Sequence, residues 1–264
     1  MTLIKLWAFT RKALDAQFVR GGDLSTGLSI PSFPVNLMTY RIIRCLINFL
    51  MKLLAHVDVE GIENLPTTGG YIVVANHLGR MDIPLVYYLL KRDDVILLVA
   101  EKYRQYGVVR WLAKKLNALW LDRFSADFKA LRQTLDRLNA GGVLVIAPEG
   151  TRSPTGALIE GKAGASYLAV KSGLPLAPVA TTGTEDKLVK SQLKQFKRLK
   201  ISVRVGKPFQ LQPLSGRNRD AFLRDATDEI MCQIAALLPE AYRGVYAGHP
   251  RLNQLLSSQE IKED

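Results

Sequence analysis

The chain carries the stretch YIVVANHLGRMD at residues 71–82, in which an apolar run passes directly into a polar turn. The run Tyr71–Ala75 has the length and continuous apolar character of a strand that is covered on both faces of a sheet. His77 and Asp82 follow, five positions apart. On one continuous helix such residues point about 140° away from each other. They meet only if residues 76–80 form a turn, which Gly79 suits, and a helix begins near Asp82, which Pro84 suits.

If that turn forms, the His77 imidazole can act as a general base and the Asp82 carboxylate can hold it in position. The chain has three histidines, and the other two lie outside any comparable setting. The alternative is that Asp82 only caps the helix and that His77 is an ordinary loop residue.

Two further strand-like runs also end in polar residues. Residues 143–147 lead into Pro148-Glu149-Gly150-Thr151-Arg152-Ser153, and the run Leu119-Trp120-Leu121 leads into Asp122-Arg123. In open α/β sheets the ligand site lies at the carboxyl ends of the strands, so these turns should meet the His-Asp turn. Free backbone N–H groups and guanidinium groups are the components of a phosphate site. The alternative for each turn alone is a solvated arginine.

In order and spacing these blocks, with a fourth at Leu174-Pro175-Leu176-Ala177-Pro178-Val179, resemble the lysophosphatidic acid acyltransferases, the 1-acyl-sn-glycerol-3-phosphate acyltransferase family of glycerolipid acyltransferases. The resemblance runs from about Val57 to Tyr246. It implies that His77 and Asp82 are the catalytic pair. It also implies that the acceptor pocket is formed by Arg123, Glu149, Gly150, Thr151 and Arg152, with the arginines on phosphate. Lys102 is a further candidate for a phosphate contact.

The resemblance implies transfer of a fatty acyl group from a thioester, acyl-CoA or acyl carrier protein, to the free hydroxyl of lysophosphatidic acid. The thioester is a co-substrate, so no cofactor is expected. No metal site is expected, because His77 is the one well-placed histidine and the two cysteines are not clustered. Two alternatives stay open. One is an acyltransferase for another lysophospholipid or an amino-acid lipid, and the other is a non-enzymatic, basic membrane-binding protein.

The net charge of +12 and the pI of about 9.7 favour anionic partners such as a phospholipid surface. Nucleic acid is not expected, because no binding motif is present. Residues 35–54 are apolar except for a narrow basic face with Arg41, Arg44 and Lys52. This pattern predicts a helix lying in the interface of a membrane, at the cytoplasmic face, and the alternative is a helix packed on the core. Residues 187–207 are basic and contain no acid, which suits lipid, an acidic acyl carrier or plain solvent.

The alternation of strand and helix patterns predicts an α/β fold with a mixed, mostly parallel sheet flanked by helices. Strands are expected at 71–75, 95–100, 118–122, 143–147, 176–180 and 201–205. Helices are expected at 82–91, 107–116, 125–139, 161–172 and 217–238. Residues 1–56, with a first helix at 2–19, are expected to form an N-terminal helix–loop–helix membrane appendage. Residues 57–246 would form the acyltransferase domain, and residues 247–264 a C-terminal tail.

Overall fold

A single sheet organises the computed structural model, which describes residues 37–122, 127–213 and 218–260. Its strand order is β1-β7-β6-β2-β5-β3-β4. Neighbouring strands run parallel except for the antiparallel pair β6 and β7, which confirms the predicted mixed, mostly parallel sheet. The strands are β1 Ala55–Glu60, β2 Tyr71–Ala75, β3 Val95–Ala100, β4 Leu119–Leu121, β5 Val143–Ile146, β6 Leu176–Thr182 and β7 Leu199–Val205.

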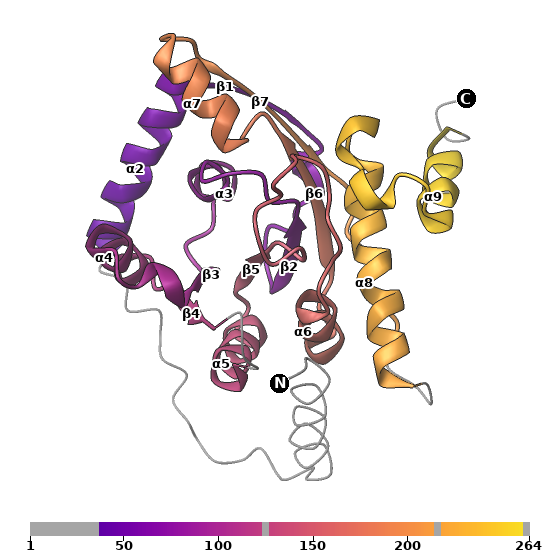
Figure 1. Ribbon diagram of the computed structural model, residues 1–264. Helices are drawn as coiled ribbons and strands as arrows, with labels where there is room; N and C mark the ends of the chain where they lie inside the picture. The colour runs from indigo at the N-terminus through magenta and orange to yellow at the C-terminus, as the bar shows by residue number, and fades with distance from the viewer. Residues whose placement is uncertain (1–36, 123–126, 214–217, 261–264) are drawn as a thin grey trace, which may run out of the picture.

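Helices cover both faces of this sheet (Figure 1). Alternate side chains of β2 point to opposite faces, so Ile72 and Val74 pack with α6 and α8, while Tyr71 and Val73 pack with α2 and α3. This double burial explains why β2 is apolar at every position. The helices are α2 Leu37–Leu54, α3 Asp82–Leu89, α4 Gly107–Lys115, α5 Phe128–Asn139, α6 Gly164–Ser172, α7 Asp186–Lys194, α8 Arg219–Ala236 and α9 Pro250–Glu260.

The sequence did not predict β1. This edge strand follows α2 without a break at Ala55 and pairs with β7, so the expected domain boundary after residue 56 falls inside a strand. After the buried Ala55, its residues alternate between exposed and half-buried positions. This alternation is short and directly follows a helical pattern, so the sequence does not separate the strand from the helix. The expected first helix at 2–19 lies outside the described residues.

The expected C-terminal tail is also part of the fold. Within residues 250–260 the chain forms α9, which packs against α8 and buries Leu252 completely. Cys232 of α8 lies 3.3 Å (Sγ to Nδ1) from His249, just before α9. Burial raises the pKa of the Cys232 thiol to about 12, so this cysteine is an inert packing residue.

Helix α2 has two different faces. Tyr40 and Met51 are buried, and the Tyr40 ring meets Tyr87 of α3 edge-on. The opposite face carries six large apolar side chains that are 40% to 70% exposed. We call these residues the α2 apolar stripe: Met38, Ile42, Leu46, Phe49, Leu50 and Leu53. The sequence left two alternatives for residues 35–54, a helix in the membrane interface and a helix packed on the core. One face of α2 is packed on the core, while the other face has no protein packed against it within the described chain.

Arg44 does not belong to a lipid-facing basic stripe, which corrects the sequence interpretation. Its guanidinium turns toward the protein and donates to the carbonyl oxygens of Leu90 at 2.6 Å and Arg92 at 3.3 Å. It also donates to Asp93 Oδ1 at 3.0 Å. Arg44 thus fastens α2 to the carboxyl end of α3. No helix in the described ranges has both the length and the apolar character needed to cross a bilayer.

Candidate active site

The turn after β2 brings His77 and Asp82 together. α3 begins at Asp82, as predicted, and His77 Nδ1 lies 2.6 Å from Asp82 Oδ2. The same oxygen accepts the backbone N–H groups of Leu78 at 2.9 Å and Gly79 at 3.1 Å. Because a carboxylate only accepts hydrogen bonds, the neutral form of this imidazole carries its proton on Nδ1 and has its lone pair on Nε2. The arrangement can therefore supply an oriented base.

Close packing holds this turn in place from the side of β6. Asn76 donates to Thr181 O at 2.8 Å and accepts the Thr181 N–H at 2.8 Å, which joins the ends of β2 and β6. At Gly79 an added Cβ would stand only 1.9 Å from the carbonyl oxygen of Thr184. Glycine is therefore required at this position by contact with a neighbouring backbone.

Glu149 joins the His-Asp turn to the loop after β5. Its Oε1 accepts the His77 N–H at 2.9 Å, and its Oε2 accepts the Ile159 N–H at 3.2 Å. Only 1% of the residue is exposed, and this burial raises the pKa of its carboxyl above the ordinary value. The loop also donates from Ser153 N to His77 O at 2.8 Å. The carboxylate therefore fastens two loops, a different role from the pocket-lining one predicted from the sequence.

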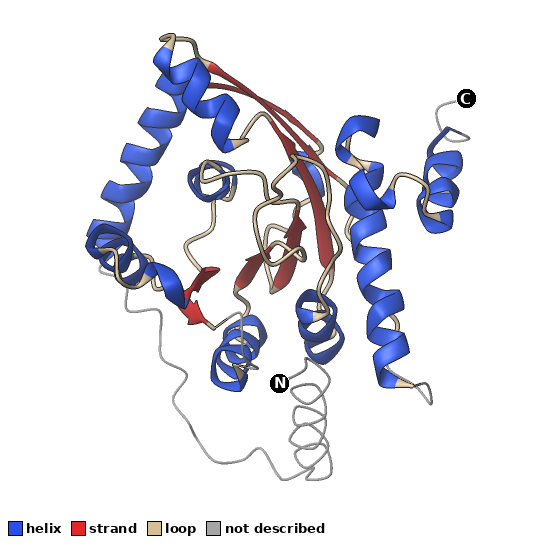
Figure 2. Cartoon of the chain, in the orientation of Figure 1, coloured by secondary structure: helices blue, strands red, loops and turns tan. Residues whose placement is uncertain are grey.

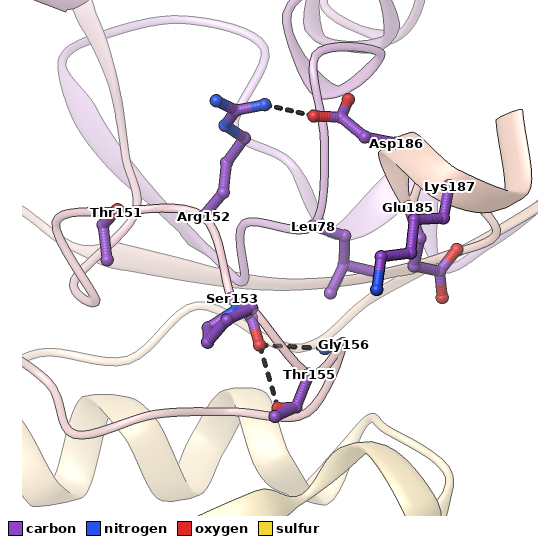
Figure 3. A pocket seen from close by; sticks show the side chains of 10 residues that line it. Leu78, Thr151, Arg152, Ser153, Thr155, Gly156, Glu185, Asp186 and Lys187 are labelled. Atoms are coloured by element: carbon purple, nitrogen blue, oxygen red, sulfur yellow. Dashed lines mark hydrogen bonds and ion pairs between the residues drawn. The ribbon is translucent and has the colours of Figure 1, made fainter. Parts of the chain in front are cut away.

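A hollow of about 370 Å³ opens beside this turn (Figure 3). It is lined by Leu78, residues 151–156 and residues 185–187. Arg152 reaches across it to form an ion pair with Asp186, the first residue of α7. Asp186 also accepts the Arg80 N–H at 2.9 Å. The hollow thus offers a guanidinium whose direction is fixed by a carboxylate.

The other predicted site residues lie at different distances from the hollow. Thr151 lines it. Gly150 has a φ of 67° and packs against the Lys162 side chain, where a Cβ would meet Cδ at 3.0 Å. The Lys102 ammonium lies 5.2 Å from the centre of the Tyr103 ring, and the Tyr103 hydroxyl is 3.4 Å from Arg152 Nη2. Arg123 lies outside the described residues.

Sequence reasoning missed Asp186, Glu185 and Tyr103. Glu185 and Asp186 follow β6, which lies beside β2 in the sheet. Their position at the same edge as His77 could be inferred only once the strand order was known. The loops that carry the site gather between the helices of the two faces (Figure 2). Within residues 37–122, 127–213 and 218–260, no three His, Cys, Asp or Glu side chains cluster as metal ligands.

Comparisons with known proteins find similar acyltransferases. The Acyltransferase family model covers residues 56–182. The 1-acyl-sn-glycerol-3-phosphate acyltransferase alpha of Mus musculus is 27% identical over 199 residues, which are 71% of this chain and 68% of that protein. The corresponding enzyme of Bacillus subtilis is 24% identical over 169 residues, 64% of this chain and 81% of its own length.

The chain spans about half, 48%, of a chloroplastic 1-acyl-sn-glycerol-3-phosphate acyltransferase of Brassica napus; this match is 29% identical and includes 60% of the chain. Among solved structures, the crystal structure of the 1-acyl-sn-glycerophosphate acyltransferase of Thermotoga maritima superposes with a TM-score of 0.55 at 26% identity. That match covers 84% of this chain and 85% of the other.

Proposed function

We propose that the chain is an acyltransferase of the kind to which the lysophosphatidic acid acyltransferases belong, and that it moves a fatty acyl group from an acyl thioester to the free hydroxyl of lysophosphatidic acid. The product would be phosphatidic acid. The observation that carries the proposal is the His77–Asp82 contact of 2.6 Å beside a hollow that contains Arg152.

In the proposed reaction, His77 Nε2 takes the proton of the acceptor hydroxyl while its oxygen attacks the thioester carbonyl carbon. A C–O bond forms, and the carbonyl becomes an oxyanion. The C–S bond then breaks, and the leaving thiolate recovers the proton from His77. Asp82 keeps the imidazole in the tautomer that leaves Nε2 free and stabilises the imidazolium that forms. The acceptor itself supplies the nucleophile, so no serine or cysteine nucleophile is needed.

Arg152 is the proposed contact for the acceptor phosphate. A guanidinium has five N–H donors, so the contact with Asp186 fixes its plane and leaves other donors for phosphate oxygens. Lys187 lines the same hollow. Lys102 and Arg123 remain candidates for further phosphate contacts, and Thr151 for a hydroxyl contact.

One observation favours a second candidate acceptor. The charged residues that line the hollow are two cations, Arg152 and Lys187, and two acids, Glu185 and Asp186. This balance suits an acceptor whose head group contains an amine together with an anion, such as an amino-acid lipid or a zwitterionic lysophospholipid. For a phosphate monoester the positive charge of Arg152 would be partly neutralised by its ion pair with Asp186.

We propose that the α2 apolar stripe lies on the surface of a membrane, which would place the chain where both lipid substrate and product reside. Lys52 and Arg41 are exposed at the edges of the stripe and suit anionic head groups. The localisation proposed is therefore membrane-associated, at the cytoplasmic face.

A thioester assay tests the proposed function. The purified chain is mixed with acyl-CoA or acyl carrier protein thioester, free thiol is followed, and the lipid product is identified by mass spectrometry. Lysophosphatidic acid, other lysophospholipids and a lyso amino-acid lipid are compared as acceptors. Fastest thiol release with lysophosphatidic acid supports the first candidate, and preference for the amine-bearing lipid supports the second. No acceptor-dependent thiol release from any of them would contradict both and favour a non-enzymatic protein.

A further inference from the structure

Phe196 is the most exposed large apolar side chain among the described residues, at 98%. It lies in the turn between α7 and β7, at a φ of 54°, in the left-handed region that side chains larger than glycine disfavour. The turn is nevertheless hydrogen-bonded: Phe196 N donates to Leu193 O at 3.1 Å and Lys197 N donates to Gln192 O at 3.0 Å. A hydrogen-bonded turn thus exposes a bulky apolar ring to solvent, at a backbone conformation that is unfavourable for residues with a side chain.

This turn, residues 195–198, lies beside the carboxyl end of α2. Arg198 donates to the carbonyl oxygens of Lys52 at 2.7 Å and Ala55 at 2.6 Å. In Figure 1, α7 accordingly stands next to the end of α2 from which β1 departs. The exposed Leu53 of the α2 apolar stripe is only one residue from Lys52. The exposed Phe196 therefore lies on a turn that is bonded to the same end of α2 at which the stripe ends.

The charge around the turn is of one sign. Lys190, Lys194 and Lys197 are exposed, and residues 187–207 contain no acid. Lysines that flank an exposed aromatic ring suit the region where anionic head groups meet acyl chains, since the ring reaches the apolar layer and the ammonium groups stay among the phosphates.

We propose that the 195–198 turn is a second membrane contact, in which Phe196 inserts into the same anionic lipid surface that the α2 apolar stripe meets. This inference rests on the proposed docking of α2. It adds a contact about 140 residues further along the chain. In the sequence, α2 precedes the catalytic turn and this second contact follows it. Two separated contacts would fix the rotation of the domain on the membrane, which a single helix does not.

The test places an environment-sensitive fluorophore at position 196. Phe196→Cys is made with Cys45→Ser, because Cys45 is exposed and Cys232 is buried. The matched control is Val245→Cys, at a residue that is 66% exposed in a segment contacting α8 on the opposite face of the sheet. Vesicles contain phosphatidylcholine alone or with phosphatidylglycerol, and some carry a quencher in the acyl region.

With anionic vesicles, the label at 196 should shift to shorter wavelength and be quenched, while the label at 245 should not. Phe196→Ser should weaken vesicle binding roughly tenfold, since one large apolar side chain no longer leaves water. The same variant should keep its thiol-release rate with a detergent-dispersed acceptor, so loss of docking is separated from failure of the proposed chemistry.

Three results would overturn the inference. If the chain binds anionic vesicles while the label at 196 stays in water, α2 docks but the turn does not. If the label responds to acyl carrier protein and not to vesicles, the turn is a carrier site. Absence of any vesicle binding would overturn both membrane contacts.

Discussion

Asp82→Asn should remove the charge of the catalytic carboxylate without changing the tautomer of His77. Three donors converge on Asp82 Oδ2, namely His77 Nδ1 and the backbone N–H groups of Leu78 and Gly79. The amide NH₂ of asparagine cannot face two backbone N–H groups, so its carbonyl oxygen must take this position. Nδ1 of His77 then still donates, and Nε2 still has its lone pair. In a serine-protease triad the equivalent change gives the wrong tautomer and a far larger loss.

The expected effect follows from the difference between a charged and a neutral acceptor. A hydrogen bond to a charged group contributes about 1.5–3 kcal/mol and a neutral one about 0.5–1.5 kcal/mol. The difference, about 1–2 kcal/mol at the imidazolium-like transition state, lowers kcat roughly 5- to 30-fold. Asp82→Ala removes all three hydrogen bonds and should cost roughly a hundredfold or more.

Stability gives an independent readout of the same substitution. Asp82 Oδ1 is buried and has no hydrogen-bond partner in the described part of the chain. The asparagine NH₂ would replace this unpaired oxygen, and the three hydrogen bonds to a charged Oδ2 would become bonds to a neutral oxygen, which should lower the free energy of unfolding by about 1–3 kcal/mol.

The assay measures kcat for thiol release at saturating acceptor and the free energy of unfolding in denaturant, for wild type and both variants. Imidazole nitrogen NMR shifts report the tautomer. If Asp82→Asn loses as much activity as Asp82→Ala while remaining folded, the tautomer reasoning is refuted. If it keeps the wild-type rate, the charge of Asp82 has no part in the reaction.

Three further substitutions test other parts of the site. Arg152→Ala should raise KM for a phosphate-bearing acceptor roughly tenfold or more, from a lost contact of about 1.5–3 kcal/mol, and leave slow thioester hydrolysis unchanged; equal losses in both reactions would contradict a phosphate role. Burial raises the pKa of Glu149, so the folded state holds its proton to higher pH than the unfolded chain, and this carboxyl's contribution to stability should fall as pH rises from its ordinary value of 4.5. The free energy of unfolding in denaturant should therefore decrease with rising pH more steeply in wild type than in Glu149→Gln. Parallel pH profiles of the two proteins would rule out a contribution from this carboxyl. Gly79→Ala places a Cβ against Thr184 O and should lower the free energy of unfolding by about 1–3 kcal/mol with loss of activity, which thermal unfolding and thiol release would measure; unchanged values would mean that the turn adjusts freely.

The sequence predicted the form of the His-Asp turn, because helix geometry leaves His77 and Asp82 only one way to meet. The preference for a catalytic pair over a simple helix cap came from the later motif blocks and the family resemblance. The apolar runs around His77 and Asp82 specified a doubly covered sheet, since β2 is buried on both faces. The prediction missed β1, where the pattern of apolar and polar residues was ambiguous. Edge strand β1 is half exposed, and it directly follows a helical pattern.

Long-range polar contacts could not be predicted from the sequence. Asp186 follows Arg152 by 34 residues, and the strand order β6-β2-β5 brings the loops that carry them to the same edge of the sheet. The basic face of residues 35–54 did not reveal that Arg44 turns inward to the carbonyl groups after α3, because a helical pattern specifies a face and not its neighbour. Glu149 was assigned to the pocket by the family resemblance, which did not reveal that two backbone N–H groups donate to its carboxylate inside the fold.

The central claim is that His77 is the base that activates the acceptor hydroxyl. Its most direct test is the rate of phosphatidic acid formation by His77→Ala, with His56→Ala on the exposed edge of β1 as the matched control. The rate should fall roughly a hundredfold or more for His77→Ala and stay at the wild-type level for His56→Ala, with both variants folded. A folded His77→Ala variant that forms the lipid product at a near-normal rate would contradict the account.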